Sequence, residues 1–179
     1  MSATASNLDP PSPSLQGPPR IDLSTRSKWR LTGPDRLRYL NGQTTNDLPN
    51  LAQGAACRSA ILDHKGRMQG EVFIAKAADA LYIDGPACLR ETLGARLERY
   101  LVADDAALED ITDQWHLLHL RPPQHPSQEL SFASSRYLEP GTDLWLPVNS
   151  PLPSPLAPEA EAEPLRIIRC LPAWGQEID

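Results

Sequence analysis

The feature that most constrains the fold of this chain is a pair of apolar segments joined by a short polar turn. Residues 55–62 and 68–75 are rich in apolar side chains, and Asp63-His64-Lys65-Gly66 lies between them. Gly66 supplies the positive φ that such a tight turn usually needs. The sequence therefore predicts a β-hairpin. Residues 29–112 around it hold most of the remaining segments from which a functional site could be built.

The segment before the hairpin predicts a strand, a short helix and a polar turn. Residues 29–32 alternate apolar and polar side chains, as a half-buried strand does. Pro34 suits the first position of a helix, and Gly42 suits its end. The polar run 43–47 follows, and its side chains either cap a turn or line a ligand pocket. The candidate ligand residues in this run are Thr44, Thr45 and Asn46.

The segment after the hairpin predicts a strand and then a longer helix. Residues 81–85 form the strand, and Pro86 opens a helix that extends to about Val102. Leucines at three- and four-residue spacing give this helix one apolar face, at Leu89, Leu93, Leu97 and Leu101. We expect this face to lie on the sheet as part of the core.

Further strands are predicted beyond this helix. The acidic run 104–113 is typical of a solvated edge strand, and residues 114–121 predict another strand. Residues 132–148 predict a hairpin that turns at Pro140-Gly141.

The second hairpin strand contains one acidic residue among apolar neighbours. Glu71 is the only ionisable side chain between Met68 and Lys76. A carboxylate in such a strand is either solvated at an open face or recruited to a ligand. Glu71 is therefore a candidate ligand residue, and it is the candidate base if the protein is an enzyme.

Cysteine and histidine spacing predicts no metal site and no nucleophile triad. The three cysteines lie far apart, with no C-x-x-C pair, at Cys57, Cys88 and Cys170. His116 and His119 are three residues apart, so on a strand they point to opposite faces. His125 lies in a proline-rich loop.

The two ends of the chain differ in composition from the middle. Residues 1–20 and 149–164 are rich in proline, which predicts a disordered tail and a linker. The domain between them is predicted to span 21–148. Residues 165–171 predict an amphipathic helix, so we expect 165–179 to be the start of a second, truncated segment.

Charge and hydropathy exclude some partners. The net charge of −6 and the pI near 5.2 argue against direct nucleic-acid binding, which needs clustered Lys and Arg. No apolar run approaches the roughly 18 residues of a membrane span. With no signal peptide and no disulfide framework, we expect a cytoplasmic protein.

Three segments, in this order, resemble one protein family. Residues 29–47, 62–72 and 166–179 are similar to the aminomethyltransferases (the glycine-cleavage T-protein) and to the YgfZ-type folate-binding proteins. The first runs Trp29-Arg-Leu-Thr-Gly-Pro-Asp-Arg-Leu-Arg-Tyr-Leu-Asn-Gly-Gln-Thr-Thr-Asn-Asp47, and the second Leu62-Asp-His-Lys-Gly-Arg-Met-Gln-Gly-Glu-Val72. The resemblance covers roughly the first half of the family's fold. It implies an α+β fold with mixed or antiparallel sheets and a few packed helices, and a central channel for tetrahydrofolate.

The sequence departs from the family pattern at two functional positions. The place of the acid that works beside the reactive folate nitrogen falls on Gly70, and only a shift by one residue would give that role to Glu71. The place of the glutamate that binds the pterin ring falls on Ile168. Losing that charge-assisted pair is expected to weaken binding by roughly 30- to 150-fold.

The resemblance leaves a smaller set of ligand residues. It assigns an aromatic contact to Tyr82 and matches Trp174 to a family aromatic, and Met68 and the 44–46 turn complete the set.

Three functions follow from these patterns. The first is a YgfZ-like tetrahydrofolate-binding accessory protein, without catalysis, that serves iron–sulfur enzyme maintenance or tRNA modification. The second is a tetrahydrofolate-dependent aminomethyltransferase with Glu71 as its base. The third is an interaction module that keeps the fold and binds no ligand.

Overall fold

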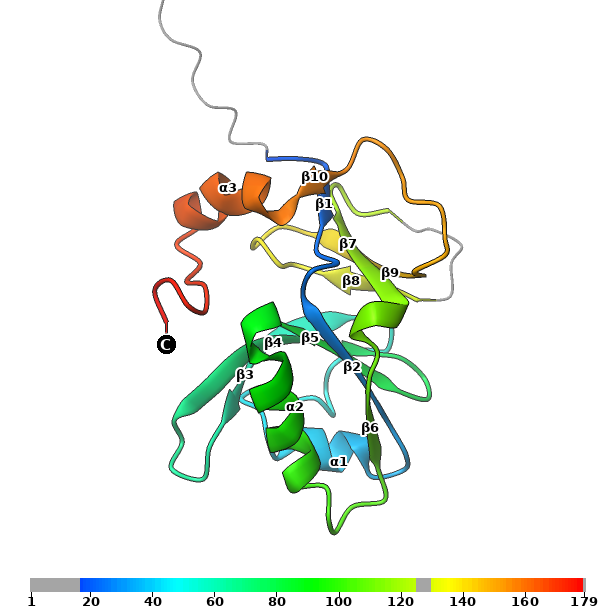
Figure 1. Cartoon of the computed structure of the whole chain (residues 1–179), viewed down its shortest axis with the longest axis vertical. Coiled ribbons are helices and arrows are strands. Elements are labelled where there is room, and N and C mark those ends of the chain that lie inside the picture. Colours follow the sequence, from blue (N-terminus) through cyan, green and yellow to red (C-terminus); the bar gives the residue numbers. More distant parts are fainter. Residues whose placement is uncertain (1–16, 125–129, 179) are drawn as a thin grey trace, which may run out of the picture.

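The computed structural model describes residues 17–124 and 130–178 of the chain. These residues form two five-stranded sheets with short helices (Figure 1). The mixed α+β fold predicted from the resemblance is confirmed. His125 and most of the predicted tail, residues 1–16, lie outside the described residues.

The first sheet, called here the hairpin sheet, is built around the predicted hairpin. Its strand order is β3-β4-β5-β2-β6, and every pair of neighbours is antiparallel. Gly66, in the turn between the first two strands, has φ +76°, as the sequence predicts. The strands are β2 (Ser27–Thr32), β3 (Ala56–Leu62), β4 (Met68–Lys76), β5 (Leu81–Gly85) and β6 (Ala107–Asp110).

Short helices cover one face of the hairpin sheet (Figure 1). They are α1 (Arg36–Asn41), η1 (Ala87–Leu89) and α2 (Arg90–Arg99). Leu93 and Leu97 of α2 are buried against Trp29 and Val72 of the sheet, so the predicted apolar stripe is core. The helix ends at Arg99 instead of Val102, and Val102 is exposed.

The second sheet has the order β10-β1-β7-β9-β8. Only the β1–β10 pair is parallel. Its strands are β1 (Arg20–Asp22), β7 (Trp115–Leu120), β8 (Ser131–Ser134), β9 (Gly141–Pro147) and β10 (Ala157–Pro158). A short turn of helix, η2 (Thr112–Gln114), precedes β7. Leu117 and Trp145 of this sheet pack on Tyr82 of the hairpin sheet, so the second core lies between the two sheets.

Part of residues 149–164, the segment predicted as a linker, forms a short strand and a turn of helix. Ala157 pairs with Ile21 in the second sheet, and η3 (Glu159–Ala162) follows with Ala162 buried. Strand β10 could not be predicted from the sequence, because it is two residues long and pairs only with a partner far away in the chain. The domain boundaries at 148 and 165 stay a prediction. Leu165 of α3 (Glu163–Ile168) packs in the same core.

The hairpin predicted over 132–148 forms with a longer connection. Residues 135–140 separate β8 from β9, and both Arg136 and Tyr137 in this connection are buried. Gly141 begins β9, and a Cβ at this position would lie 2.6 Å from Nε2 of His119. Gly141 therefore allows the His119 ring to pack closely against the backbone, whereas the sequence predicts that Gly141 is part of a turn.

Candidate ligand-binding site

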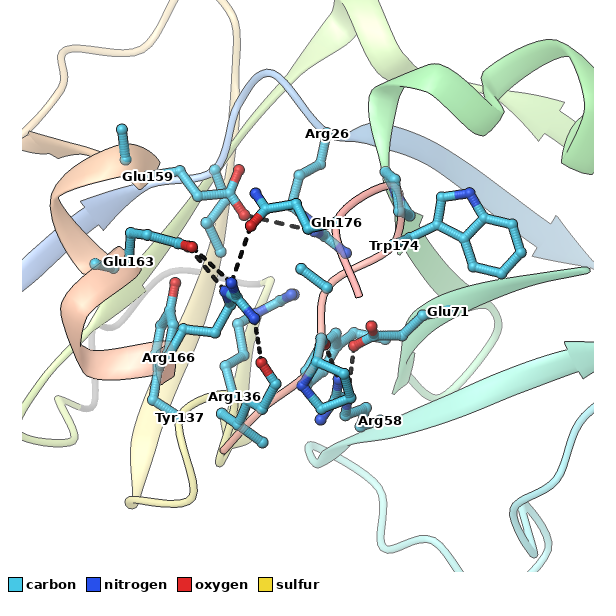
Figure 2. A pocket seen from close by; sticks show the side chains of 18 of the residues that line it. Arg26, Arg58, Glu71, Arg136, Tyr137, Glu159, Glu163, Arg166, Trp174 and Gln176 are labelled. Atoms are coloured by element: carbon cyan, nitrogen blue, oxygen red, sulfur yellow. Dashed lines mark hydrogen bonds and ion pairs between the residues drawn. The ribbon is translucent and has the colours of Figure 1, made fainter. Parts of the chain in front are cut away.

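A cavity of about 380 Å³ opens where the hairpin sheet, the β8–β9 connection and the C-terminal segment meet (Figure 2). Its size is within the range of small-molecule sites, roughly 300–1,000 Å³. Four arginines and three glutamates line it together with aromatic side chains. The charged lining residues are Arg26, Arg58, Arg136, Arg166, Glu71, Glu159 and Glu163, and the aromatic ones are Phe73, Tyr137 and Trp174.

Strand β4 presents Glu71, and not residue 70, to this cavity. Successive side chains of a strand point to opposite faces, so the face of Gly70 is the one covered by helices. A Cβ at Gly70 would lie 2.8 Å from Cδ1 of Leu89 and 3.4 Å from Leu93, so a side chain there requires these leucines to shift. The position that the resemblance assigns to the family's acid therefore lies under the helices, and β4 presents its carboxylate to the cavity one residue later.

Arg58 of the neighbouring strand holds Glu71. Its Nε donates a hydrogen bond to the Glu71 carboxylate, and its Nη2 donates to the carbonyl oxygen of Pro172 at 2.7 Å. One guanidinium thus ties the hairpin sheet to the C-terminal turn that closes the cavity. The Glu71 side chain is mostly buried against this partner.

A buried charge network surrounds Arg136, which lines the cavity. Asp143 of β9 accepts two hydrogen bonds from Nε of Arg136, both at 2.9 Å, and one at 2.8 Å from Nδ1 of His119. Asp84 of β5 accepts from Nη1 and Nη2 of the same arginine, the first at 3.0 Å. Arg136 therefore joins one acid from each sheet, and its Cζ lies 4.0 Å from the centroid of the Phe73 ring.

The neighbouring charges in this network shift the pKa values of Asp143 and Arg136. Burial by itself would raise the pKa of Asp143, but the Arg136 charge and the His119 hydrogen bond outweigh it and lower the pKa to about 2. Burial disfavours the charged form of Arg136, yet Asp143 and Asp84 keep its pKa above the usual value. Arg136 and Asp143 are therefore ionised groups that are paired inside the protein.

Arg166 of α3 organises the opposite wall. Its guanidinium donates to both carboxylate oxygens of Glu163, at 2.8 and 2.6 Å, and also bonds Gln176 and Glu177 at 2.9 to 3.0 Å. The Arg166 hydrogen bond lowers the pKa of Glu163. These bonds fix the turn of residues 171–178, which places Trp174 in the cavity lining.

Two of the residues predicted from the sequence line the cavity, namely Glu71 and Trp174. Tyr82 instead lies between the sheets, with its ring centroid 5.4 Å from that of Trp145 and 5.9 Å from that of Phe132. Burial raises the pKa of its phenol. Tyr82 is thus a core aromatic and does not reach the cavity.

The polar turn before the hairpin also lies elsewhere. Thr44 Oγ1 donates to Leu40 O at 3.1 Å, the Thr45 and Ser59 hydroxyls lie 3.3 Å apart, and Asn46 donates to a β3 carbonyl. These bonds are those of a capped turn beside β3. Neither this turn nor Met68, at the start of β4, lines the cavity.

Sequence reasoning missed most of the charged lining. Part of this lining could have been inferred from the acids within apolar strands, Asp84 and Asp143, since a buried carboxylate needs a partner. The identity of that partner, Arg136, could not be read from local sequence. Ile168 is 52% exposed on α3 and does not line the cavity, so the family's pterin-binding position is not part of this site.

Within residues 17–124 and 130–178, no three His, Cys, Asp or Glu side chains are grouped to hold a metal ion. None of the helices in that part of the chain has the length and apolarity to cross a membrane.

Comparison with curated proteins found two relatives of partial length. A chloroplastic protein of Arabidopsis thaliana named as a transferase is 29% identical over 107 residues, which are 58% of this chain and 24% of the relative. The aminomethyltransferase of Rubrobacter xylanophilus is 27% identical over 104 residues, 58% of this chain and 28% of the relative. The chain thus spans about a quarter of the length of these relatives.

Comparison with solved structures supports the fold. The glycine cleavage system aminomethyltransferase T of Bartonella henselae superposes with a TM-score of 0.62 at 19% identity, over 82% of this chain and 45% of that one. The family model described as the GCVT N-terminal domain matches residues 19–129, more than half of the chain. The chain therefore belongs to the GCVT N-terminal domain family, that of the aminomethyltransferase folate-binding domain.

Proposed function

We propose that this protein binds tetrahydrofolate in the cavity as a YgfZ-like accessory protein and does not itself transfer a one-carbon unit. Membership of the family supports the choice of ligand. The lining supports it as well, since aromatic side chains suit a pterin ring and guanidinium groups suit the carboxylates of a glutamyl tail.

The observation that carries the non-catalytic part is the environment of residues 70 and 71. Leu89 and Leu93 pack against Gly70, so a side chain at this position would have to displace them. The carboxylate that does face the cavity, Glu71, accepts a hydrogen bond from Arg58, so part of its capacity to take a proton from a ligand is already used. Binding without transfer agrees with this arrangement.

The proposed setting is the one inferred from the sequence. The protein would act in the cytoplasm, with iron–sulfur or tRNA-modifying enzymes as its partners. Fluorescence of the tryptophans, of which Trp174 lines the cavity, offers the direct test. Tetrahydrofolate should quench it in a saturable way, and no quenching up to about 1 mM, a binding free energy near −4 kcal/mol, would exclude both folate functions and leave the interaction module.

A second function, aminomethyl transfer to tetrahydrofolate, is favoured by one observation. Glu71 is the acid of β4 that lines the cavity, where a base would have to lie. Glycine-cleavage activity with the lipoyl carrier protein separates the two functions. The accessory protein should show none, whereas the enzyme should be active and should lose that activity in Glu71→Gln.

A further inference from the structure

The turn that closes the cavity is held in place by few apolar contacts. Residues 172–178 are exposed or half-buried, and Leu171 is the residue of the turn that packs in the core. Pro172, Ala173 and Trp174 line the cavity. A segment that buries little apolar surface can open locally while the rest of the protein stays folded. The polar bonds of this turn therefore control how the cavity opens to solvent.

These polar bonds come from two arginines. Arg166 donates to Gln176 and to Glu177, which ties the turn to α3. Arg58 Nη2 donates to the carbonyl oxygen of Pro172 at 2.7 Å. Within residues 17–124 and 130–178, this is the only hydrogen bond that joins the turn to the hairpin sheet. The turn can therefore move away from the sheet only when the Arg58 bond breaks.

Glu71 holds Arg58 in the orientation that this bond needs. Arg58 pairs with Phe73 in the sheet, so Arg58 and Glu71 are diagonal neighbours on the cavity face of β3 and β4. Glu71 accepts from Nε of Arg58, while Nη2 of the same guanidinium donates to Pro172 (Figure 2). The Arg58 side chain is 31% exposed, so without Glu71 it would sample many rotamers. The Glu71 bond removes that freedom.

We propose that the bond from Arg58 to Pro172 is a latch on the cavity and that Glu71 is the positioning residue of this latch. Glu71 orients the guanidinium, Arg58 binds the backbone of the turn, and a ligand enters or leaves when the latch opens. The carboxylate of β4 thus serves closure of the site. This inference rests on the proposed function for its ligand, whereas the latch itself is measurable in the free protein.

The first test measures the latch without a ligand. Hydrogen exchange followed by mass spectrometry reports the opening of residues 173–178. Arg58→Met removes the bond to Pro172 and should speed this exchange about tenfold or more, the size expected for a hydrogen bond from a charged group. Arg58→Lys keeps a cation but loses the planar fork that reaches both partners, so it should speed exchange as well.

The second test asks whether Glu71 acts through Arg58. Glu71→Gln should speed exchange of residues 173–178 by about three- to tenfold, because a neutral amide holds the guanidinium less firmly than a carboxylate does. In the Arg58→Met background the same substitution should add nothing, since the residue through which Glu71 acts is gone.

A matched control for both substitutions lies in the same sheet. Arg30 of β2 donates to Glu109 of β6 at 2.7 Å, and neither residue lines the cavity. Arg30→Met and Glu109→Gln therefore break an arginine–glutamate pair of the hairpin sheet without touching the turn. Both should leave exchange of residues 173–178 within about twofold of the unchanged protein.

The third test uses tetrahydrofolate and stopped-flow fluorescence of the tryptophans. A latch governs entry and release alike, so Arg58→Met should raise the association and dissociation rate constants together, each by about tenfold. The dissociation constant should then stay within about threefold. A rise of the dissociation rate constant alone would show that Arg58 contacts the ligand directly, and the latch would be overturned.

The remaining outcomes separate this inference from the proposed function. Unchanged exchange of residues 173–178 in both Arg58 variants, at an unchanged midpoint of thermal unfolding, overturns the latch and leaves folate binding intact. An effect of Glu71→Gln that persists in Arg58→Met overturns the positioning role. If tetrahydrofolate does not bind, the proposed function is overturned, while faster exchange in the variants still supports the latch. If Arg58→Met does not fold, Arg58→Lys and Glu71→Gln decide the first test.

Discussion

Single residues of this protein show how a buried acid can be predicted without its partner. Asp84 and Asp143 interrupt apolar strands, and each is almost fully buried. Their shared partner, Arg136, lies 52 residues from the first and 7 from the second, in a connection that the sequence predicts as part of a hairpin. Side-chain chemistry demands a cation at this place, but only the tertiary fold identifies it.

Removing that cation should be among the most damaging single changes. Arg136→Met leaves two carboxylates buried without their main partner, which is expected to lower the free energy of unfolding by about 3–5 kcal/mol. Urea denaturation measures this loss. Arg67→Met is the control, because the Arg67 side chain is 68% exposed and should contribute less than about 0.5 kcal/mol. A loss below about 1 kcal/mol in Arg136→Met would contradict the role of the network.

The same network predicts a dependence of stability on pH. The pKa of Asp143 is about 2 in the folded protein, against 3.8 as its ordinary value. Because the folded pKa is the lower one, the contribution is fully present above about pH 5 and is lost as the pH falls toward 2. A difference of about 2 units corresponds to roughly 2–3 kcal/mol. Denaturation at several pH values should show this loss, with a smaller slope in Asp143→Asn.

At the scale of elements, the sequence predicts well wherever the pattern is local. The hairpin of β3 and β4, its turn at Gly66 and the leucine face of α2 all form as expected. The prediction fails at β10, whose two residues pair with β1 from the other end of the chain. A strand that short carries no periodicity, so its existence depends on the partner and not on its own side chains.

The contact between β4 and the helices above it can be tested at Gly70. Gly70→Asp would bring a Cβ within 2.8 Å of Leu89 and bury a carboxylate among leucines. We expect a loss of about 2–4 kcal/mol in urea denaturation, with no gain of aminomethyl transfer. Gln69→Asp is the control on the same strand, since that side chain is exposed. Tolerance of Gly70→Asp would show that the helices can move aside.

At the scale of the whole molecule, the cavity belongs to no single element. Its lining comes from residues 23–26 before β2, from β3 and β4, from residues 86–87 after β5, from the β8–β9 connection and from residues 159–176. Sequence analysis finds Glu71 because it departs from its local pattern and Trp174 because it matches a family aromatic, but it assigns Tyr82 to the ligand although that ring lies in the core between the sheets. Which side chains converge is decided by how the two sheets are stacked.

Because both sheets and the C-terminal segment build the cavity, a bound ligand should stabilise all of them at once. At a ligand concentration about 100 times the dissociation constant, the free energy of unfolding should rise by about 2.7 kcal/mol. Differential scanning calorimetry with tetrahydrofolate should show one transition that moves upward as a whole. A shift confined to part of a split transition would indicate that the ligand contacts only one sheet.

The bond from Arg58 to Pro172 has a consequence for how this protein can change over generations. Arg58 donates a hydrogen bond to the backbone carbonyl oxygen of residue 172, and this oxygen is present whichever amino acid stands at that position. Substitutions can therefore change the side chains of the turn at residues 171–178, and with them the ligands that the cavity binds, while the backbone of the turn keeps its position.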